Sequence, residues 1–235
     1  MMSDARVYLI PSFLDEDAIQ TIPAYIVDLL KTCQVFFVEN ERTARRFLKK
    51  IWKEMTIDNY EWHVIDEKES QWKSKFVDLL KDGKQIGILS EAGCPGIADP
   101  GQILVATAQD LGAQVTPLVG PSSIILGLMA SGLNGQQFQF LGYLPIEQQA
   151  RLKKIKEIES ESRKKHCTQI FIETPYRNNQ LLTAILSTCQ PETRLCIAVS
   201  ITGRDENIQT KSIAAWKGQS PDLNKKPAIF LILAS

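Results

Sequence analysis

Hydrophobic residues follow two alternating patterns along the first half of the chain: short apolar runs typical of buried strands, and longer stretches with apolar residues at helical spacing. The strands are expected at residues 7–10, 34–38, 62–65 and 85–89. The helices are expected at residues 18–31, 41–53 and 67–80. Such alternation predicts a mostly parallel sheet with helices on both faces, and a ligand site beyond the carboxyl ends of the strands.

The pattern continues less regularly in the second half. After a helix, a strand and a second helix at residues 103–111, 114–118 and 122–131, strand-like runs follow at 138–141, 168–172, 195–199 and 228–233. The change in composition predicts an N-terminal α/β lobe of residues 1–119 and a C-terminal α/β lobe of residues 120–235. No long flexible linker separates them, so we expect packed lobes with a cleft between them.

Composition narrows the class of protein. The 235 residues are 44% hydrophobic and 23% charged, as in globular proteins, and 27 basic residues balance 27 acidic ones, so only a local patch could attract a polyanion. The apolar run before Pro11 is too short for a signal peptide or a membrane span, which predicts a cytoplasmic protein. Five cysteines without a C-x-x-C pair and only two histidines argue against disulfides and against a metal site.

The segment most suggestive of a ligand site is the Gly/Pro loop, which we define as residues 90–101. It follows an expected buried strand and precedes an expected helix. Glycines allow backbone to approach a ligand closely and to adopt positive φ, while prolines fix the turn. The spacing matches neither a P-loop nor a dinucleotide fingerprint. A rigid connecting turn is the alternative interpretation.

A second segment, residues 117–123, places Pro121 and two serines at the start of an expected helix. Free amides there could bind the carboxylate of an amino-acid-like ligand, although a plain helix cap explains the same residues. The segment approaches a G-x-S-x-G nucleophile pattern but lacks the final glycine, which disfavours a serine hydrolase.

The expected helix at 41–53 carries a basic face. Its cations fall at i, i+3, i+4, i+7, i+8 and i+11, opposite the apolar stripe: Arg42, Arg45, Arg46, Lys49, Lys50 and Lys53. This face could contact RNA phosphates. The alternative is a solvated helix face paired with neighbouring acids such as Glu39, Glu41 and Glu54.

Four motifs in order resemble the tetrapyrrole methylase superfamily. They are the Gly/Pro loop, Leu118-Val119-Gly120-Pro121-Ser122-Ser123, Phe140-Leu141-Gly142-Tyr143-Leu144-Pro145 and Phe171-Ile172-Glu173-Thr174-Pro175-Tyr176-Arg177. The most similar branch is that of the ribosomal RNA small-subunit methyltransferases I, which methylate a cytidine ribose 2′-hydroxyl. The resemblance implies a homodimer of two αβα lobes with mostly parallel sheets, with S-adenosylmethionine in the cleft between the lobes.

Carried over by position, the resemblance also implies site residues. The cofactor contacts would be Glu91, Ala92, Gly93, Pro95, Ser122, Ser123, Gly142 and Tyr143. Methyl transfer from an activated sulfonium needs positioning more than catalytic groups. A ribose hydroxyl would still gain from a base or a nearby cation, and Glu173 and Arg177 are the candidates, with a structural ion pair as the alternative.

Departures from the ribosomal branch leave the substrate open. Residues 11–17 contain three acids and no glycine, where that branch has Pro-Thr-Pro-Ile-Gly-Asn-Leu. Residues 200–203 lack the acid and the lysine of its Glu-Leu-Thr-Lys. The chain also stops at Ser235, and this predicts a short form without the usual C-terminal extension. We expect a methyltransferase acting on RNA. The alternatives are methylation of a tetrapyrrole or other small molecule, and a paralogue that binds cofactor or a partner without turnover.

Overall fold

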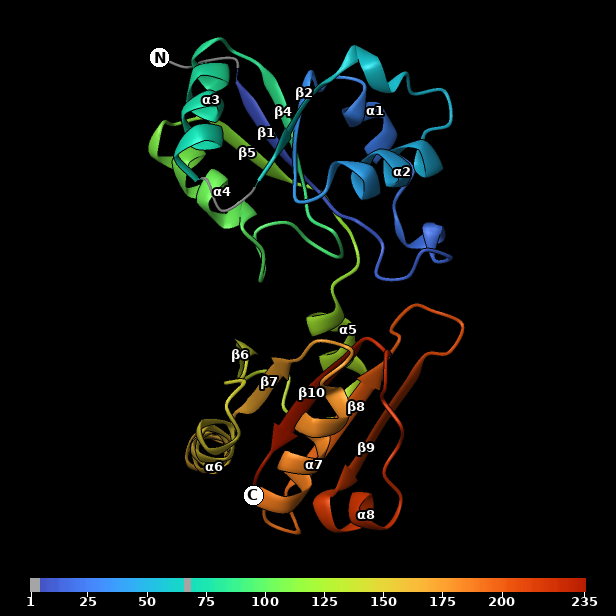
Figure 1. Cartoon of the computed structure of the whole chain (residues 1–235), viewed down its shortest axis with the longest axis vertical. Coiled ribbons are helices and arrows are strands. Elements are labelled where there is room, and N and C mark those ends of the chain that lie inside the picture. Colours follow the sequence, from blue (N-terminus) through green and yellow to red (C-terminus); the bar gives the residue numbers. More distant parts are fainter. Residues whose placement is uncertain (1–4, 66–68) are drawn as a thin grey trace. The chain divides into compact units, whose positions relative to one another are not determined.

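The computed structural model describes residues 5–65 and 69–235, and the chain divides into two compact units. The first unit ends at Ser122 and the second begins at Ser123, three residues beyond the expected lobe boundary. Each unit consists of one five-stranded sheet with its own helices (Figure 1).

The first sheet is parallel throughout. Its strands are β1 (Arg6–Ile10), β2 (Val35–Val38), β3 (Glu61–Val64), β4 (Gln85–Leu89) and β5 (Gln114–Pro117). They lie in the order β3-β2-β4-β1-β5, and every adjacent pair runs parallel. The carboxyl ends of the strands therefore share one edge, as the alternating pattern predicts.

Helices cover both faces of this sheet (Figure 1). The described helical elements are η1 (Ile19–Thr21), α1 (Ile26–Leu30), α2 (Glu41–Ile51), η2 (Ile57–Asn59), α3 (Glu69–Lys81) and α4 (Gly101–Asp110). The fully buried strand β2 shows why both faces need cover, because Phe37 packs with Phe76 of α3 on one side and Phe36 packs among residues of α1 and α2 on the other. Residues 67 and 68, where the α3 helix was expected to begin, lie outside the described residues.

The prediction of a single helix at residues 18–31 is wrong. The chain forms the short η1 and then α1, with Pro23 between them. Ile22 is extended, at φ −97° and ψ 115°, which is the conformation that a following proline favours. Proline also lacks the amide that a continuous helix would use, so the apolar spacing alone overestimates the helix length.

The second sheet corrects the expectation of mostly parallel sheets. Its strands are β6 (Phe138–Tyr143), β7 (Thr168–Ile172), β8 (Arg194–Val199), β9 (Asn207–Ser212) and β10 (Ala228–Leu233), in the order β6-β7-β10-β8-β9. Only β6 and β7 pair in parallel, and the other three pairs are antiparallel. The short connection at residues 200–206 makes β8 and β9 a hairpin, whereas a parallel pair would need a longer crossover.

Helices also cover both faces of the second sheet (Figure 1). They are α5 (Ser123–Ser131), α6 (Gln148–Lys165), α7 (Asn178–Thr188) and α8 (Ile213–Gly218). The main core lies under α6 and α7, where Ile155 and Ile185 pack with Phe171 and Phe230. On the other face, Gly127 lets α5 approach β10 closely, since an added Cβ would lie 3.2 Å from Ile229.

Candidate active site

The loops that follow β1, β4 and β5 are tied together at the carboxyl edge of the first sheet. Ser12 donates its amide to the Gly93 carbonyl at 2.8 Å, and the Gly93 amide donates to the Ser12 carbonyl at 3.1 Å. The Ser12 hydroxyl donates to the carbonyl of Ser90 at 2.8 Å. The Gly/Pro loop is therefore held in place by the loop after β1, which the sequence motifs did not single out.

Glycines set the path of these loops. Gly93 and Gly96 have φ of 75° and 82°, a region that other residues rarely adopt. Asp99 fixes the turn because its carboxylate accepts the amides of Gly96 and Gly101 at 2.9 and 2.8 Å. Gly120, in the loop after β5, lies so close to the first loop that an added Cβ would sit 2.1 Å from the Pro11 Cβ.

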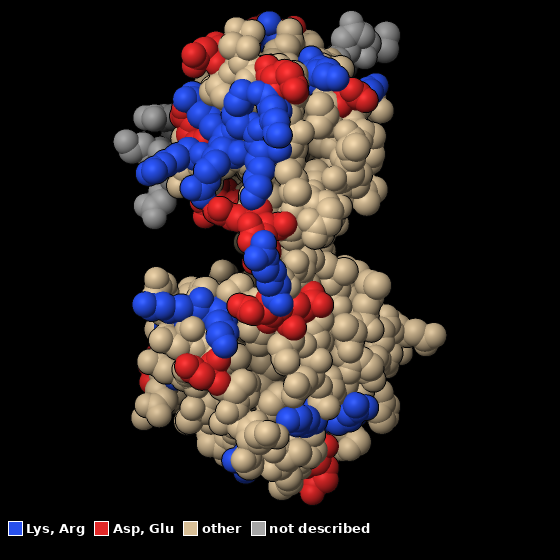
Figure 2. Space-filling model, turned by 90° about the vertical axis from the view of Figure 1, so that its right-hand side faces the viewer, with Lys and Arg blue, Asp and Glu red and all other residues tan. Residues whose placement is uncertain are grey.

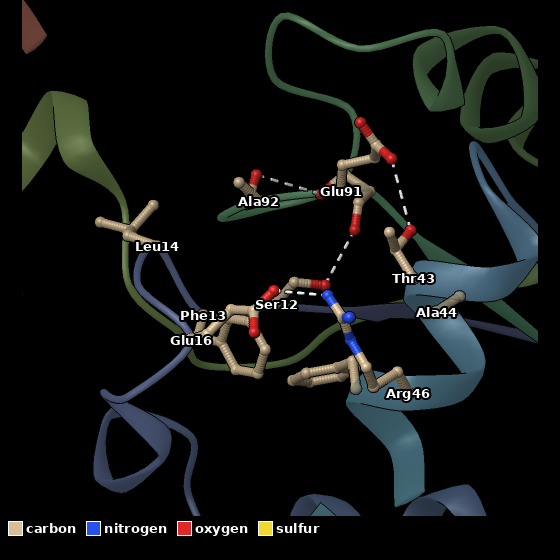
Figure 3. Close-up of a pocket in the computed structure, with 11 residues that line it drawn as sticks. Ser12, Phe13, Leu14, Glu16, Thr43, Ala44, Arg46, Glu91 and Ala92 are labelled. Carbon is tan, nitrogen blue, oxygen red and sulfur yellow. Dashed lines mark hydrogen bonds and ion pairs between the residues drawn. The ribbon is translucent and has the colours of Figure 1, made fainter. Parts of the chain in front are cut away.

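A cavity of about 220 Å³ opens at this edge (Figure 3). Its walls come from the loop after β1, from the N-terminal half of α2 and from the Gly/Pro loop: Ser12, Phe13, Leu14, Glu16, Thr43, Ala44, Arg46, Phe47, Ser90, Glu91 and Ala92. Arg46 reaches from α2 toward the first loop, and the Thr43 hydroxyl donates to Glu91 at 3.3 Å. Pockets that enclose a whole small ligand usually measure about 300–1,000 Å³, so this cavity suits one part of a larger ligand.

Three carboxylates gather beside the Gly/Pro loop: Glu39, Glu91 and Asp99. Glu39 directly follows β2 and accepts the Glu91 amide at 2.9 Å. Burial raises the pKa of the Glu39 carboxyl, and the charges of Asp99 and Glu91 raise it further, although the Glu91 amide works against the shift. Burial also raises the pKa of Asp99 despite its two amide bonds. Within residues 5–65 and 69–235, none of the three has an ion pair with a basic side chain.

Five of the six expected cations lie on α2, but the helix ends at Ile51, so Lys53 lies beyond it and the expected helix at 41–53 is too long. Figure 2 shows Lys and Arg side chains gathered on the first unit, with acidic side chains at the margin. Part of it is paired. Arg45 contacts Glu41 and Arg46 contacts Glu16, each at 2.5 Å. Lys49 and Lys50 donate to backbone carbonyls. Arg42 and Lys53 project their side chains without an ion pair in the described part of the chain.

In the second unit, Tyr143 and Glu173 lie at the carboxyl ends of the parallel strands β6 and β7. Gly142 has φ of 68°, at a break in the β6–β7 register, and Tyr143 is largely exposed. The Glu173 side chain is buried, and its Oε1 accepts the Thr174 amide at 2.6 Å and Arg177 Nη2 at 2.7 Å. Burial alone would raise the pKa of the Glu173 carboxyl, but Arg177 and the Thr174 amide outweigh it and hold the pKa below its usual range.

The Glu173–Arg177 pair leaves one oxygen available. Glu173 Oε2 is buried and has no hydrogen-bond partner among the residues that the structure describes. Arg177 is partly exposed, and the nearby Tyr143 raises the pKa of its guanidinium slightly beyond the effect of Glu173. The expected catalytic residues therefore lie together with Tyr143, one of the expected cofactor residues.

The remaining expected cofactor residues occupy varied environments. Glu91 and Ala92 are exposed and line the cavity, whereas Pro95 is buried inside the Gly/Pro loop. Ser122 ends the first unit and Ser123 begins α5, and both are half-buried.

Comparison with known proteins decides the family. The sequence profile described as tetrapyrrole (corrin/porphyrin) methylases matches residues 21–215. The chain belongs to this family. It is accordingly a methyltransferase that uses S-adenosylmethionine as the methyl donor, as the resemblance of the four motifs implied.

Relatives of this tetrapyrrole methylase carry a more specific name. The ribosomal RNA small subunit methyltransferase I of Vibrio cholerae serotype O1 is 31% identical over 96% of this chain and 76% of the relative. Its namesake from Pasteurella multocida is 32% identical over 71% of this chain and 59% of the relative. Among solved structures, the methyltransferase CobJ superposes with a TM-score of 0.63 at 14% identity, covering 98% of this chain and 93% of CobJ, which supports the shared fold.

The residues at the first sheet's edge fit a positively charged cofactor. S-adenosylmethionine carries positive charge on its sulfur and on its ammonium group, and the three clustered carboxylates would be stabilised by such charge. Among residues 5–65 and 69–235, no group of three or more His, Cys, Asp or Glu side chains has an arrangement that could hold a metal ion. The same ranges contain no helix long and apolar enough to cross a membrane.

Two of these carboxylates, Glu39 and Asp99, were not among the site residues expected from the sequence. Glu39 follows an expected strand directly, so the rule that ligands bind beyond strand carboxyl ends could have indicated it. Asp99 stands inside the Gly/Pro loop, but its two bonds to glycine amides depend on the folded turn. Ser12 lies in the segment where the chain departs from the ribosomal branch, and only the structure shows its contact with Gly93.

Proposed function

We propose that this tetrapyrrole methylase acts on RNA, with a ribose 2′-hydroxyl of small-subunit ribosomal RNA as the methyl acceptor. The observation that carries the proposal is the position of Arg46, which belongs to the basic face of α2 and also lines the cavity beside the Gly/Pro loop. A polyanion bound along α2 would thus be led to the edge of the sheet where the cavity opens. The names of the relatives from Vibrio and Pasteurella support the same substrate class.

For the cofactor, we propose contacts with the residues that the motifs implied. Glu91 and Ala92 support this because they are exposed beside a cavity, and Gly93 because its positive φ turns the loop at that point. The other proposed contacts are Pro95, Ser122, Ser123, Gly142 and Tyr143. When bound, S-adenosylmethionine supplies a methyl group activated by the positive charge on sulfur.

For the acceptor, we propose that Glu173 and Arg177 act as a pair. A carboxyl whose pKa lies below the usual range is a weak base at neutral pH, so Glu173 suits hydrogen bonding to the acceptor hydroxyl through the free Oε2 better than full proton removal. Arg177, fixed by Glu173, would stabilise negative charge that develops on the oxygen.

The experiment is methylation of purified small ribosomal subunits with S-adenosylmethionine labelled in the methyl group. We expect label in the RNA, located at a ribose by nuclease digestion and mass spectrometry. Glu173→Gln is expected to lower kcat at least tenfold while cofactor affinity, measured by calorimetry, stays within twofold.

Other outcomes would contradict the RNA proposal. Label in no RNA species, with S-adenosylmethionine still bound, would leave a methyltransferase with another acceptor. Activity on a tetrapyrrole that is unaffected by salt would identify a small-molecule enzyme, because phosphate contacts weaken steeply as salt rises. Failure to bind either S-adenosylmethionine or its demethylated product would identify a paralogue without turnover.

We also propose, from the family resemblance, that the protein is a cytoplasmic homodimer. Sedimentation equilibrium is expected to give twice the chain mass of 26.4 kDa. A single-chain mass at micromolar concentration would contradict the dimer, and cell fractionation tests the compartment.

A further inference from the structure

Glu16 contacts two cations of the basic face, Arg46 and Lys50, at the same time. Its carboxylate contacts Arg46, with Oε1 2.5 Å from Nη2, and its backbone carbonyl accepts Lys50 Nζ. Arg46 and Lys50 are four residues apart and therefore lie one above the other on α2. Glu16 thus places two oxygen atoms against neighbouring cations, as a phosphodiester with its unesterified oxygens could do.

The turn that carries Glu16 is held locally. The Asp15 side chain accepts the Asp17 amide at 2.9 Å, and the Asp15 carbonyl accepts the Ala18 amide at 3.0 Å. Next to the turn, Lys50 Nζ lies 5.4 Å from the centre of the Phe13 ring, and Phe13 packs edge-on against Phe47 of α2. The loop therefore docks on α2 at the cavity, where Phe13, Glu16 and Arg46 all form walls (Figure 3).

The contact is nevertheless easily broken. The Glu16 and Arg46 side chains are 63% and 62% exposed, and ion pairs this exposed contribute little to stability. A phosphate has stronger acceptor oxygens and forms charge-assisted bonds with arginine. Replacing Glu16 on Arg46 by a phosphate therefore costs little in the free protein and gains a stronger bond.

We propose that Arg46 and Lys50 form a binding site for one RNA phosphodiester at the mouth of the cavity, and that Glu16 occupies this site until an RNA phosphate displaces it. The inference rests on the proposed action on RNA and adds a residue that determines affinity. Glu16 lowers binding of a polyanion that reaches Arg46 alone, because the ion pair with Arg46 must be broken without the compensating contact to Lys50. Glu16 therefore increases the selectivity of the protein for an RNA that contacts both cations and also fits the cavity.

The test measures binding of a single-stranded RNA oligonucleotide by fluorescence anisotropy at low and moderate salt. Glu16→Gln is expected to tighten binding about two- to fivefold, the equivalent of one exposed ion pair. The gain should shrink as salt rises, because salt screens the Glu16–Arg46 pair. The matched control is Asp28→Asn, which removes the same charge from an exposed ion pair with Lys31 elsewhere in the first unit and is expected to change affinity much less.

A double-variant cycle decides whether Glu16 acts through Arg46. Arg46→Gln should weaken binding, and adding Glu16→Gln to it should give no further gain. The inference is overturned if Glu16→Gln leaves affinity unchanged, if Asp28→Asn tightens binding equally, or if the gain persists without Arg46. In these cases wild-type RNA binding would still support the proposed function, whereas absence of RNA binding by every variant would overturn both. Thermal melting of each variant checks that the exposed substitutions leave the fold intact.

Discussion

At the scale of single residues, we expect Glu39 to link cofactor binding to stability. Burial raises its pKa, so the folded state binds a proton more tightly than the unfolded state. The ionised carboxylate therefore destabilises the first unit at neutral pH, and this penalty disappears as pH falls through the raised pKa. A cationic ligand would offset the penalty at neutral pH.

We therefore predict that Glu39→Gln stabilises the ligand-free protein slightly, by about 0.5 kcal/mol or less. The same change should weaken S-adenosylmethionine binding about fivefold at pH 7, the effect of about 1 kcal/mol of charge interaction. Wild-type affinity should fall toward that of the variant as pH is lowered through the raised pKa of Glu39. Thermal melting and calorimetry check both effects, and Glu54→Gln, an exposed acid of the same unit, is the control. Equal affinities at pH 7 would rule out a cofactor role for Glu39.

Gly120 is a second residue that the structure constrains closely, because there is no room for a Cβ atom at this position. An added Cβ would lie 2.1 and 2.4 Å from Pro11 Cβ and Cγ, and a proline ring cannot rotate away. We predict that Gly120→Ala lowers the free energy of unfolding by about 1–3 kcal/mol, as overpacking does. Urea denaturation measures the effect. Gly135→Ala, where no atom lies within 4 Å of the new Cβ, is the control and should change stability much less.

At the scale of elements, the capping of α2 determines how the basic face is presented. The Asn40 side chain accepts the amides of Arg42 and Thr43 at 3.0 and 3.3 Å. We predict that Asn40→Ala costs about 1 kcal/mol of stability and that Asn40→Ser restores most of it, because serine also caps helices well. Denaturant titration of the three proteins checks this. Equal loss in both variants would show that Asn40 acts through something other than the cap.

Elements with a strong apolar signal could be predicted from the sequence, and those without it could not. The strands β2 and β4 of the first sheet are buried runs, so their residue ranges follow from hydrophobicity alone. β9, with the sequence Asn207 to Ser212, is polar and forms the edge of the second sheet, so no apolar alternation reveals it. Missing β9 also hid the β8–β9 hairpin, which is one of the three antiparallel pairs of that sheet.

At the scale of the whole molecule, part of the candidate site could be predicted and part depends on the fold. The Gly/Pro loop and the basic face are local in sequence, so motif and spacing indicate them. The cavity depends on contacts between distant segments, such as Ser12 with Gly93 and Arg46 with Glu16. Local patterns carry no information on such pairs, which explains why Ser12 and Glu16 were not expected beside the cavity.

The neutral net charge makes the last prediction specific. With 27 basic and 27 acidic residues, attraction to RNA must come from a patch and not from the overall field. Arg42, on α2, and Lys53, two residues beyond its end, are the cations of the basic face whose side chains have neither an ion pair nor a hydrogen bond among the described residues, so they are available for phosphates. Each phosphate contact to a single strand contributes about −0.7 to the slope of log affinity against log salt concentration.

We therefore predict that the double variant Arg42→Gln, Lys53→Gln weakens RNA binding at low salt and reduces the magnitude of this slope by about 1.4. The matched control is Lys153→Gln, Lys156→Gln, which removes two exposed cations from α6, where acidic residues alternate with the basic ones. Anisotropy titrations from low to moderate salt compare the three proteins, with calorimetry to confirm unchanged cofactor binding. Equal slopes for the two double variants would mean that RNA responds to net charge alone, and α2 would then have no particular role in binding it.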